Sequence, residues 1–164
     1  LACDHENVKP DILILGKALS GGTMPVSAVL CNDDIMLNIK PGEHGSTYGG
    51  NPLACAVAIT ALQVLKDEKM IETAAEMGTL LREGLEAIQS PFVTTVRGKG
   101  LLNAIVIEHP NKDAAWELCL QLKENGLLAK PTHGDKIRFA PPLIITKSQI
   151  SECLDIIKDS LEIL

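Results

Sequence analysis

The stretch DILILGK, residues 11–17, decides the fold of the N-terminal part of the chain. Four consecutive apolar residues, 12–15, lack the alternation of a half-exposed strand, and such a run is typical of a parallel-sheet strand buried on both faces. The run ends at Gly16 and Lys17, and a glycine-rich loop follows as far as Pro25. A second strand is expected over residues 26–31 and a brief helix from residue 33 or 34, so this part is predicted to be α/β.

Lys17 is the first candidate functional residue, because open α/β sheets bind ligands at the ends of their strands. Desolvation there would keep its amine neutral and free to bond to a carbonyl carbon. A lysine at a strand end is more often a solvated surface residue, so Lys17 alone is weak evidence. A nucleotide-binding phosphate loop is excluded, because residues 11–15 before Gly16 and Lys17 form an apolar strand without the earlier glycine that such a loop requires, and Ser20 is displaced from the required position.

The second candidate is the loop GEHGSTYGGNP, residues 42–52, which carries the adjacent hydroxyls of Ser46 and Thr47. Asn51 and Pro52 suit the N-cap and first position of a helix, so the loop leads into a helix N-terminus. Hydroxyl donors, backbone amides and the positive end of a helix dipole together favour a phosphate group. The alternative, a glycine-rich connector with ordinary serine and threonine turn bonding, stays open.

A charged segment, residues 66–69, divides the chain into two parts. Residues 1–66 are interpreted as the end of a large α/β domain, and residues 67–164 as a small α+β domain. The elements expected in the second part are a helix with apolar positions from 71 to 88, a hairpin of strands 92–97 and 101–108, a helix 114–124, strands 127–130 and 136–139, and a helix that starts at a capping box of Thr146 and Gln149.

Composition excludes several classes of function. The 164 residues carry a net charge of −6 with both signs interspersed, and only four are aromatic, which argues against a nucleic-acid or membrane partner. Five cysteines without a CxxC pair indicate free thiols in a reducing compartment, with no disulfide framework. The four histidines show no metal-ligand spacing, so no metal site is expected, and no Ser-His-Asp arrangement stands out.

Arginine occurs at three positions. Arg138 lies on an expected strand between apolar residues and prolines, where its guanidinium would suit a carboxylate, although a structural ion pair is the commoner use of such a residue. Arg82 is expected to be solvated on a helix surface. Arg97, which precedes the hairpin turn, is expected to have a structural role.

Five segments together resemble one family: LGKALSGG at 15–22, IKPGEHGSTYGGNP at 39–52, RGKGLL at 97–102, GLLAKPTH at 126–133 and RFAPP at 138–142. They are similar to the subgroup-III, or omega, aminotransferases, which use pyridoxal 5′-phosphate. The resemblance implies the C-terminal part of a fold-type-I large domain followed by a small α+β domain. Lys17 matches the lysine that holds the cofactor, Thr47 with Ser46 beside it matches the phosphate-binding threonine given to the neighbouring subunit of a homodimer or larger oligomer, and Arg138 matches the arginine that binds the substrate α-carboxylate.

The activity implied by this resemblance is transfer of the δ-amino group of ornithine to 2-oxoglutarate, giving glutamate 5-semialdehyde and glutamate. Acetylornithine or 4-aminobutyrate as amino donor, or a non-catalytic dimerisation or anion-binding module, are the alternatives. The sequence starts without a methionine, and the family's aspartate partner of the pyridine nitrogen lies before residue 1. We therefore expect missing upstream chain, no activity from these 164 residues alone, and a location in the mitochondrial matrix or cytoplasm rather than secretion.

Overall fold

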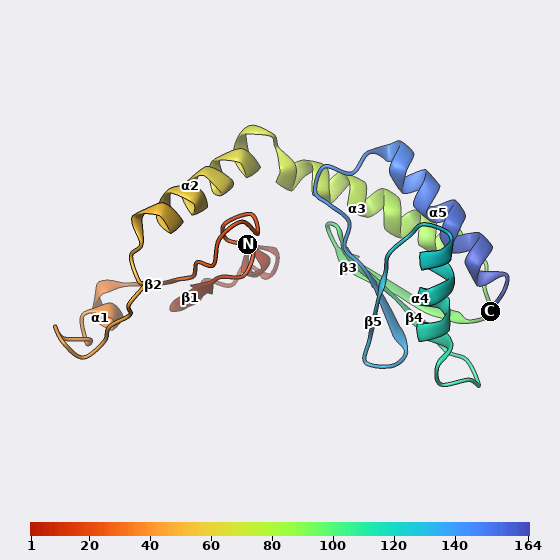
Figure 1. The fold of residues 1–164 in the computed structure, drawn as a ribbon, viewed down its shortest axis with the longest axis horizontal. Helices are drawn as coiled ribbons and strands as arrows, with labels where there is room; N and C mark the ends of the chain where they lie inside the picture. Colours follow the sequence, from red (N-terminus) through yellow and green to blue (C-terminus); the bar gives the residue numbers. More distant parts are fainter. The chain divides into compact units, whose positions relative to one another are not determined.

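The computed structural model describes residues 1–164 and divides them into two compact units, Leu1–Glu68 and Lys69–Leu164 (Figure 1). The division falls inside the charged segment 66–69, two residues beyond the boundary expected from the sequence. Both units combine helices with strands, so the chain is a mixed α/β protein. None of the helices has the length and apolar character needed to span a membrane.

The first unit opens with a 3-10 helix, Ala2–Glu6, and contains one sheet of two strands, β1 (Ile12–Leu15) and β2 (Ala28–Cys31). Both strands were predicted, but the expected parallel sheet is wrong for this pair, which is antiparallel with Ile12 opposite Cys31. Parallel pairing needs a long crossover connection, usually a helix, and residues 16–27 form turns without a helix. Burial on both faces is also wrong for β1 within this chain, because Ile14 is 73% exposed.

Two helices complete the first unit: the short α1 (Asp33–Met36) and the long α2 (Pro52–Asp67). The predicted start of α2 is confirmed. The Asn51 side-chain oxygen accepts hydrogen bonds from the backbone N–H groups of Leu53 at 2.9 Å and Ala54 at 3.3 Å, and Pro52 fills the first helical position. These bonds satisfy amides that have no partner inside the helix, which is why the helix begins here.

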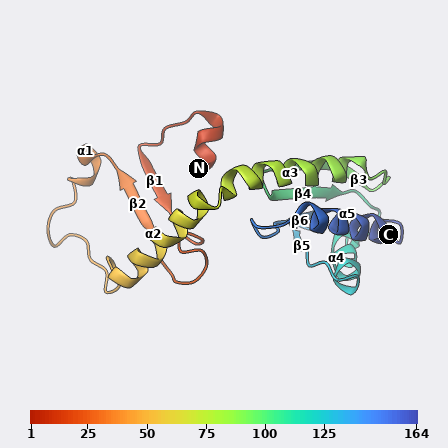
Figure 2. The same cartoon turned by 90° about the horizontal axis from the view of Figure 1, so that it is seen from above.

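The second unit is a four-stranded antiparallel sheet with three helices, in the strand order β3-β4-β6-β5 (Figure 2). Along the chain its elements are α3 (Met70–Ala87), β3 (Val93–Lys99), β4 (Leu102–Ile107), α4 (Ala114–Glu124), β5 (Lys130–Thr132), β6 (Lys136–Phe139) and α5 (Lys147–Leu161). The predicted helices, the hairpin, β6 and the capping box of α5 are confirmed.

The strand predicted over residues 127–130 is misplaced, because β5 begins only at Lys130. The backbone N–H of Leu127 donates to the Leu122 carbonyl at 2.8 Å, and that of Gly126, at φ +93°, donates to Lys123 at 3.0 Å. These two bonds form the Schellman ending of a helix. Leu127 therefore belongs to the end of α4, and the apolar pattern alone could not separate this from a strand.

The three helices pack on one face of the sheet and enclose a single, mainly aliphatic core. Its buried members come from every helix and from β4 and β6, which shows that all three helices cover the same face. Among them are Leu81 and Leu85 of α3, Ile105 of β4, Ile137 and Phe139 of β6, Leu118 and Leu122 of α4, and Ile150 and Ile157 of α5. Because strand residues alternate between faces, the residues that alternate with these core members in β4 and β6 point to the face of the sheet that the helices do not cover.

The β3–β4 turn is held against α3 by a close backbone contact and by Arg82. A Cβ atom added to Gly78 would lie 1.9 Å from the Gly100 carbonyl oxygen, so only glycine allows this approach. The Arg82 guanidinium donates to the same oxygen and to the Asn103 side-chain oxygen, each at 2.9 Å. The expectation that Arg82 is simply solvated is therefore wrong, because its group binds a turn that lies far from it in sequence.

Candidate active site

The loop that follows β1 places Lys17 in an unusual backbone conformation. Its φ is +54°, in the left-handed region that residues with a Cβ atom seldom adopt. Ser20, only 1% exposed, fixes the loop. Its hydroxyl oxygen accepts from the Met24 N–H at 3.1 Å, and its O–H donates to the Met24 carbonyl, while the Thr23 hydroxyl donates to the Ser20 carbonyl at 2.8 Å. Sequence reasoning rejected Ser20 as a phosphate ligand but missed this role, which a serine in a glycine-rich turn signals.

A cavity of about 650 Å³ lies in the first unit next to this loop. It brings together Lys17, from the loop after β1, and Ser46, from the loop before α2. The remaining lining comes from residues 22–27 and from Tyr48, Gly49, Gly50, Asn51, Ala54 and Cys55. Thr47 is not among the lining residues. Lys17 is exposed, so the desolvation expected from the sequence is not provided by these 164 residues.

The hydroxyl loop fits a phosphate group only in part. The Ser46 hydroxyl oxygen accepts from the Gly49 N–H at 3.0 Å, which is the turn bonding of the alternative interpretation, but its own proton remains available for donation. The amides of Leu53 and Ala54 at the start of α2 are already bonded to Asn51. Donors for an anion here are thus hydroxyls and loop amides rather than the first amides of the helix.

Arg138 lies in the second unit, on β6. It is exposed, and its guanidinium makes no hydrogen bond or ion pair within the chain, so a structural ion pair does not account for it here. Arg97 on β3 is likewise exposed and unbonded, and no contact supports the structural role expected for it. Both cations are free to bind an anion that comes from outside the sheet.

No group of three or more histidine, cysteine, aspartate or glutamate side chains is arranged to hold a metal ion. All five cysteines are free. Burial raises the pKa of the Cys119 thiol to about 11, and burial beside Glu152 also raises the pKa of Cys153. These two thiols therefore remain protonated near neutral pH and are poor nucleophiles.

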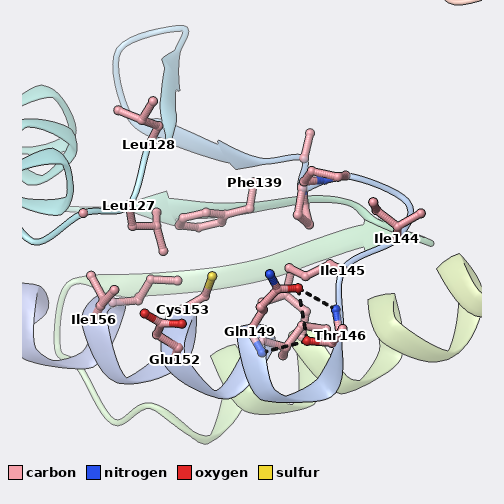
Figure 3. Close-up of a pocket in the computed structure, with 17 residues that line it drawn as sticks. Leu127, Leu128, Phe139, Ile144, Ile145, Thr146, Gln149, Glu152, Cys153 and Ile156 are labelled. Carbon is pink, nitrogen blue, oxygen red and sulfur yellow. Dashed lines mark hydrogen bonds between the residues drawn. The ribbon is translucent and has the colours of Figure 1, made fainter. Parts of the chain in front are cut away.

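A second cavity, of about 710 Å³, lies in the second unit between β6 and α5. Figure 3 shows its apolar side chains, including Leu127, Phe139 and Ile144, together with the capping box at the start of α5. Glu152 is the only charged residue that lines it. A cavity without a cation does not suit a phosphate or a carboxylate, so the cavity beside Lys17 is the better candidate for the cofactor.

Comparison with known proteins decides the family. Residues 1–161 match the family model described as Aminotransferase class-III. The chain belongs to the class-III aminotransferase family. It is 66% identical over 161 residues to the mitochondrial ornithine aminotransferase of Drosophila melanogaster and 63% identical to that of Rattus norvegicus, covering 98% of this chain and 37% of each relative.

Solved structures of aminotransferases share the fold. The acetylornithine aminotransferase of Elizabethkingia anophelis superposes with a TM-score of 0.94 at 60% identity, over 100% of this chain and 44% of that one. The ornithine aminotransferase of Plasmodium yoelii gives 0.93 at 52% identity, over 99% of this chain and 43% of that one. The chain thus has part of the pyridoxal-phosphate-dependent aminotransferase fold and spans well under half the length of these relatives.

Proposed function

We propose that the chain is part of a pyridoxal-phosphate-dependent aminotransferase that moves the δ-amino group of ornithine to 2-oxoglutarate, giving glutamate 5-semialdehyde and glutamate. The meeting of Lys17 and Ser46 at one cavity is the observation that carries the proposal. High identity to relatives named ornithine aminotransferase supports the choice of substrate. Residues 1–66 would then be the end of the large cofactor domain, and residues 67–164 the small domain.

Each candidate residue has a distinct task in this proposal. Lys17 holds the cofactor covalently, and its amine, once released, moves a proton to and from the amine-bearing carbon of the substrate. Arg138 orients the substrate by binding its α-carboxylate with two parallel N–H donors. When bound, pyridoxal phosphate supplies an electron-withdrawing ring that stabilises negative charge on that carbon.

Ser46 and Thr47 bind the cofactor phosphate in this proposal, and Thr47 does so for the neighbouring subunit of a homodimer. Thr47 is exposed, has no hydrogen bond in the chain and is absent from the lining of the cavity beside its own Lys17. A residue with those properties is available to a second copy. The amino acid and the 2-oxo acid are the small-molecule partners.

Acetylornithine is the second candidate donor, because the solved structure that superposes with a TM-score of 0.94 is named acetylornithine aminotransferase. The 4-aminobutyrate enzymes share the same proposed lysine and phosphate loop. Steady-state rates of the complete protein with ornithine, acetylornithine and 4-aminobutyrate separate the three, and a kcat/KM highest for either of the last two contradicts the proposal. The animal relatives are named mitochondrial, and we propose the mitochondrial matrix or the cytoplasm as the location.

Covalent trapping tests the proposal directly. The complete protein that contains this chain is incubated with pyridoxal 5′-phosphate, reduced with borohydride, digested and analysed by mass spectrometry. The adduct is expected on Lys17, lost in Lys17→Arg and retained in the matched surface variant Lys9→Arg. An adduct spread over several lysines, or none, favours the non-catalytic module. Ornithine transamination at full rate by the 164 residues alone would refute the expectation that they are inactive.

A further inference from the structure

The sheet of the second unit has an unusual charge distribution. In a chain with 21 acidic and 15 basic residues, its four strands contain no aspartate or glutamate. Every charged residue in these strands is basic: Arg97 and Lys99 on β3, Lys130 on β5, and Lys136 and Arg138 on β6. Such a bias in an acidic protein points to an anionic ligand.

The strand register gathers three of these cations into one row. Arg97 lies opposite Ala104, Ala104 lies opposite Arg138, and Arg138 lies opposite Lys130. Residues directly opposite each other in a sheet project from the same face. Ile105 and Ile137, the neighbours of this row in β4 and β6, are in the core, so the row lies on the face that the three helices leave open.

Lys130 and Arg138 are adjacent in this row and have no compensating acid. Their Cβ atoms are about 5 Å apart, the usual separation for an opposed pair, and like charges in this arrangement destabilise a sheet. Lys136, on the same face, is paired with Asp135. No carboxylate forms an ion pair with Lys130 or Arg138, so an anion bound between them would remove the repulsion.

We propose that Lys130 and Arg138 together hold one carboxylate group of the substrate, which makes Lys130 a further substrate-binding residue. This inference rests on the proposed function and extends it from one cation to two. The planar guanidinium of Arg138 offers two parallel donors, and the Lys130 ammonium adds a point charge to a remaining lone pair of the same carboxylate.

Arg97 provides a matched control within the same row. It is separated from Arg138 by β4, and with strands spaced about 4.8 Å apart its backbone is about 10 Å from that of Arg138. Ala104 between them offers no polar group. Removal of Arg97 therefore changes the charge of the face by the same amount as removal of Lys130, without affecting the proposed two-cation contact.

The test is a titration of the 164-residue chain with glutarate, a dicarboxylate without the reactive carbonyl, followed by NMR at about 0.15 M salt, where long-range charge effects are screened. Lys130→Ala and Lys130→Gln are expected to weaken binding about fivefold, the upper range for an exposed ion pair. Lys130→Arg and Arg97→Ala are each expected to keep the affinity for glutarate within about twofold of that of the unmodified chain. The inference is overturned if Arg97→Ala and Lys130→Ala weaken glutarate binding equally. It is also overturned if neither Lys130→Ala nor Lys130→Gln weakens it.

A second measurement separates this inference from the proposed function. In the complete protein, Lys130→Ala is expected to raise the KM for 2-oxoglutarate about fivefold while kcat stays unchanged, since binding that is uniform through the reaction affects only KM. Glutarate binding needs no cofactor. If trapping at Lys17 fails while glutarate binding still depends on Lys130, the aminotransferase activity alone is rejected. If trapping succeeds and glutarate binding does not depend on Lys130, the role of Lys130 alone is rejected.

Discussion

Replacement of Gly78 by alanine tests the close contact between α3 and the β3–β4 turn. The added Cβ would lie 1.9 Å from the oxygen, 2.2 Å from the carbonyl carbon and 2.8 Å from the Cα of Gly100. All three atoms belong to the backbone, so the turn or the helix must move, at a cost of about 3 kcal/mol or more. Alanine also favours the helix over glycine by about 1 kcal/mol. The net loss in the free energy of unfolding should be at least about 2 kcal/mol.

Gly84, on the same helix, supplies the matched control. A Cβ there would meet Leu154, 2.2 Å from Cδ1 and 2.8 Å from Cδ2, which are the ends of a side chain that can rotate. The same gain in helix propensity offsets this smaller clash, so Gly84→Ala should change the stability by less than about 1 kcal/mol.

Urea unfolding of the 164-residue chain measures both variants. The fluorescence of Trp116, the only tryptophan, reports the second unit because this residue lies on α4. This choice of probe matters, since two units need not unfold in one transition. A Gly78→Ala variant as stable as Gly84→Ala would refute the reasoning and show that the turn accommodates the methyl group.

Two further outcomes follow from the second unit. Arg82→Ala leaves the buried Asn103 oxygen without its donor and should lower the free energy of unfolding, measured by Trp116 fluorescence, by about 1.5–3 kcal/mol. Arg82→Lys should recover only part of this loss, and an alanine variant of unchanged stability would contradict the role of the guanidinium. The Cys119 thiol should resist iodoacetamide at about pH 8 while the exposed Cys55 reacts, and rapid labelling of Cys119 in the folded chain would contradict this. Because burial raises its pKa from 9.0 to about 11, the unfolded chain loses this proton first, so the contribution of this thiol to stability should be constant below pH 9 and fall as the pH rises towards 11.

Local signals in the sequence predicted most helices and their ends. Asn51 followed by Pro52 marks the start of α2, and Thr146 with Gln149 marks the start of α5, because a cap depends on residues within one turn. The partners of β1 could not be predicted in this way. Its apolar run indicates a strand, but whether the neighbouring strand is parallel depends on the connection between them, residues 16–27, which forms turns without a crossover helix.

The candidate site was predictable residue by residue but not as an arrangement. Lys17 and Ser46 each stood out from their own segment, whereas their position at one cavity depends on the path of the chain between them. The guanidinium of Arg82 was underestimated for the same reason, whereas the hydrogen bonds of Ser20 to Thr23 and Met24 are local and could have been predicted from the turn. Arg82 binds partners 18 and 21 residues away, and no periodicity in the sequence encodes such a contact.

The left-handed backbone at Lys17 means that the residue with the proposed function is not the most stable residue for that position. A φ of +54° costs a residue with a Cβ atom about 1 kcal/mol relative to glycine. A library of variants sorted by heat resistance alone would therefore enrich glycine there and discard the amine. Engineering of a more stable protein from this chain would have to leave residue 17 unchanged, or it would remove the lysine on which the proposed function depends.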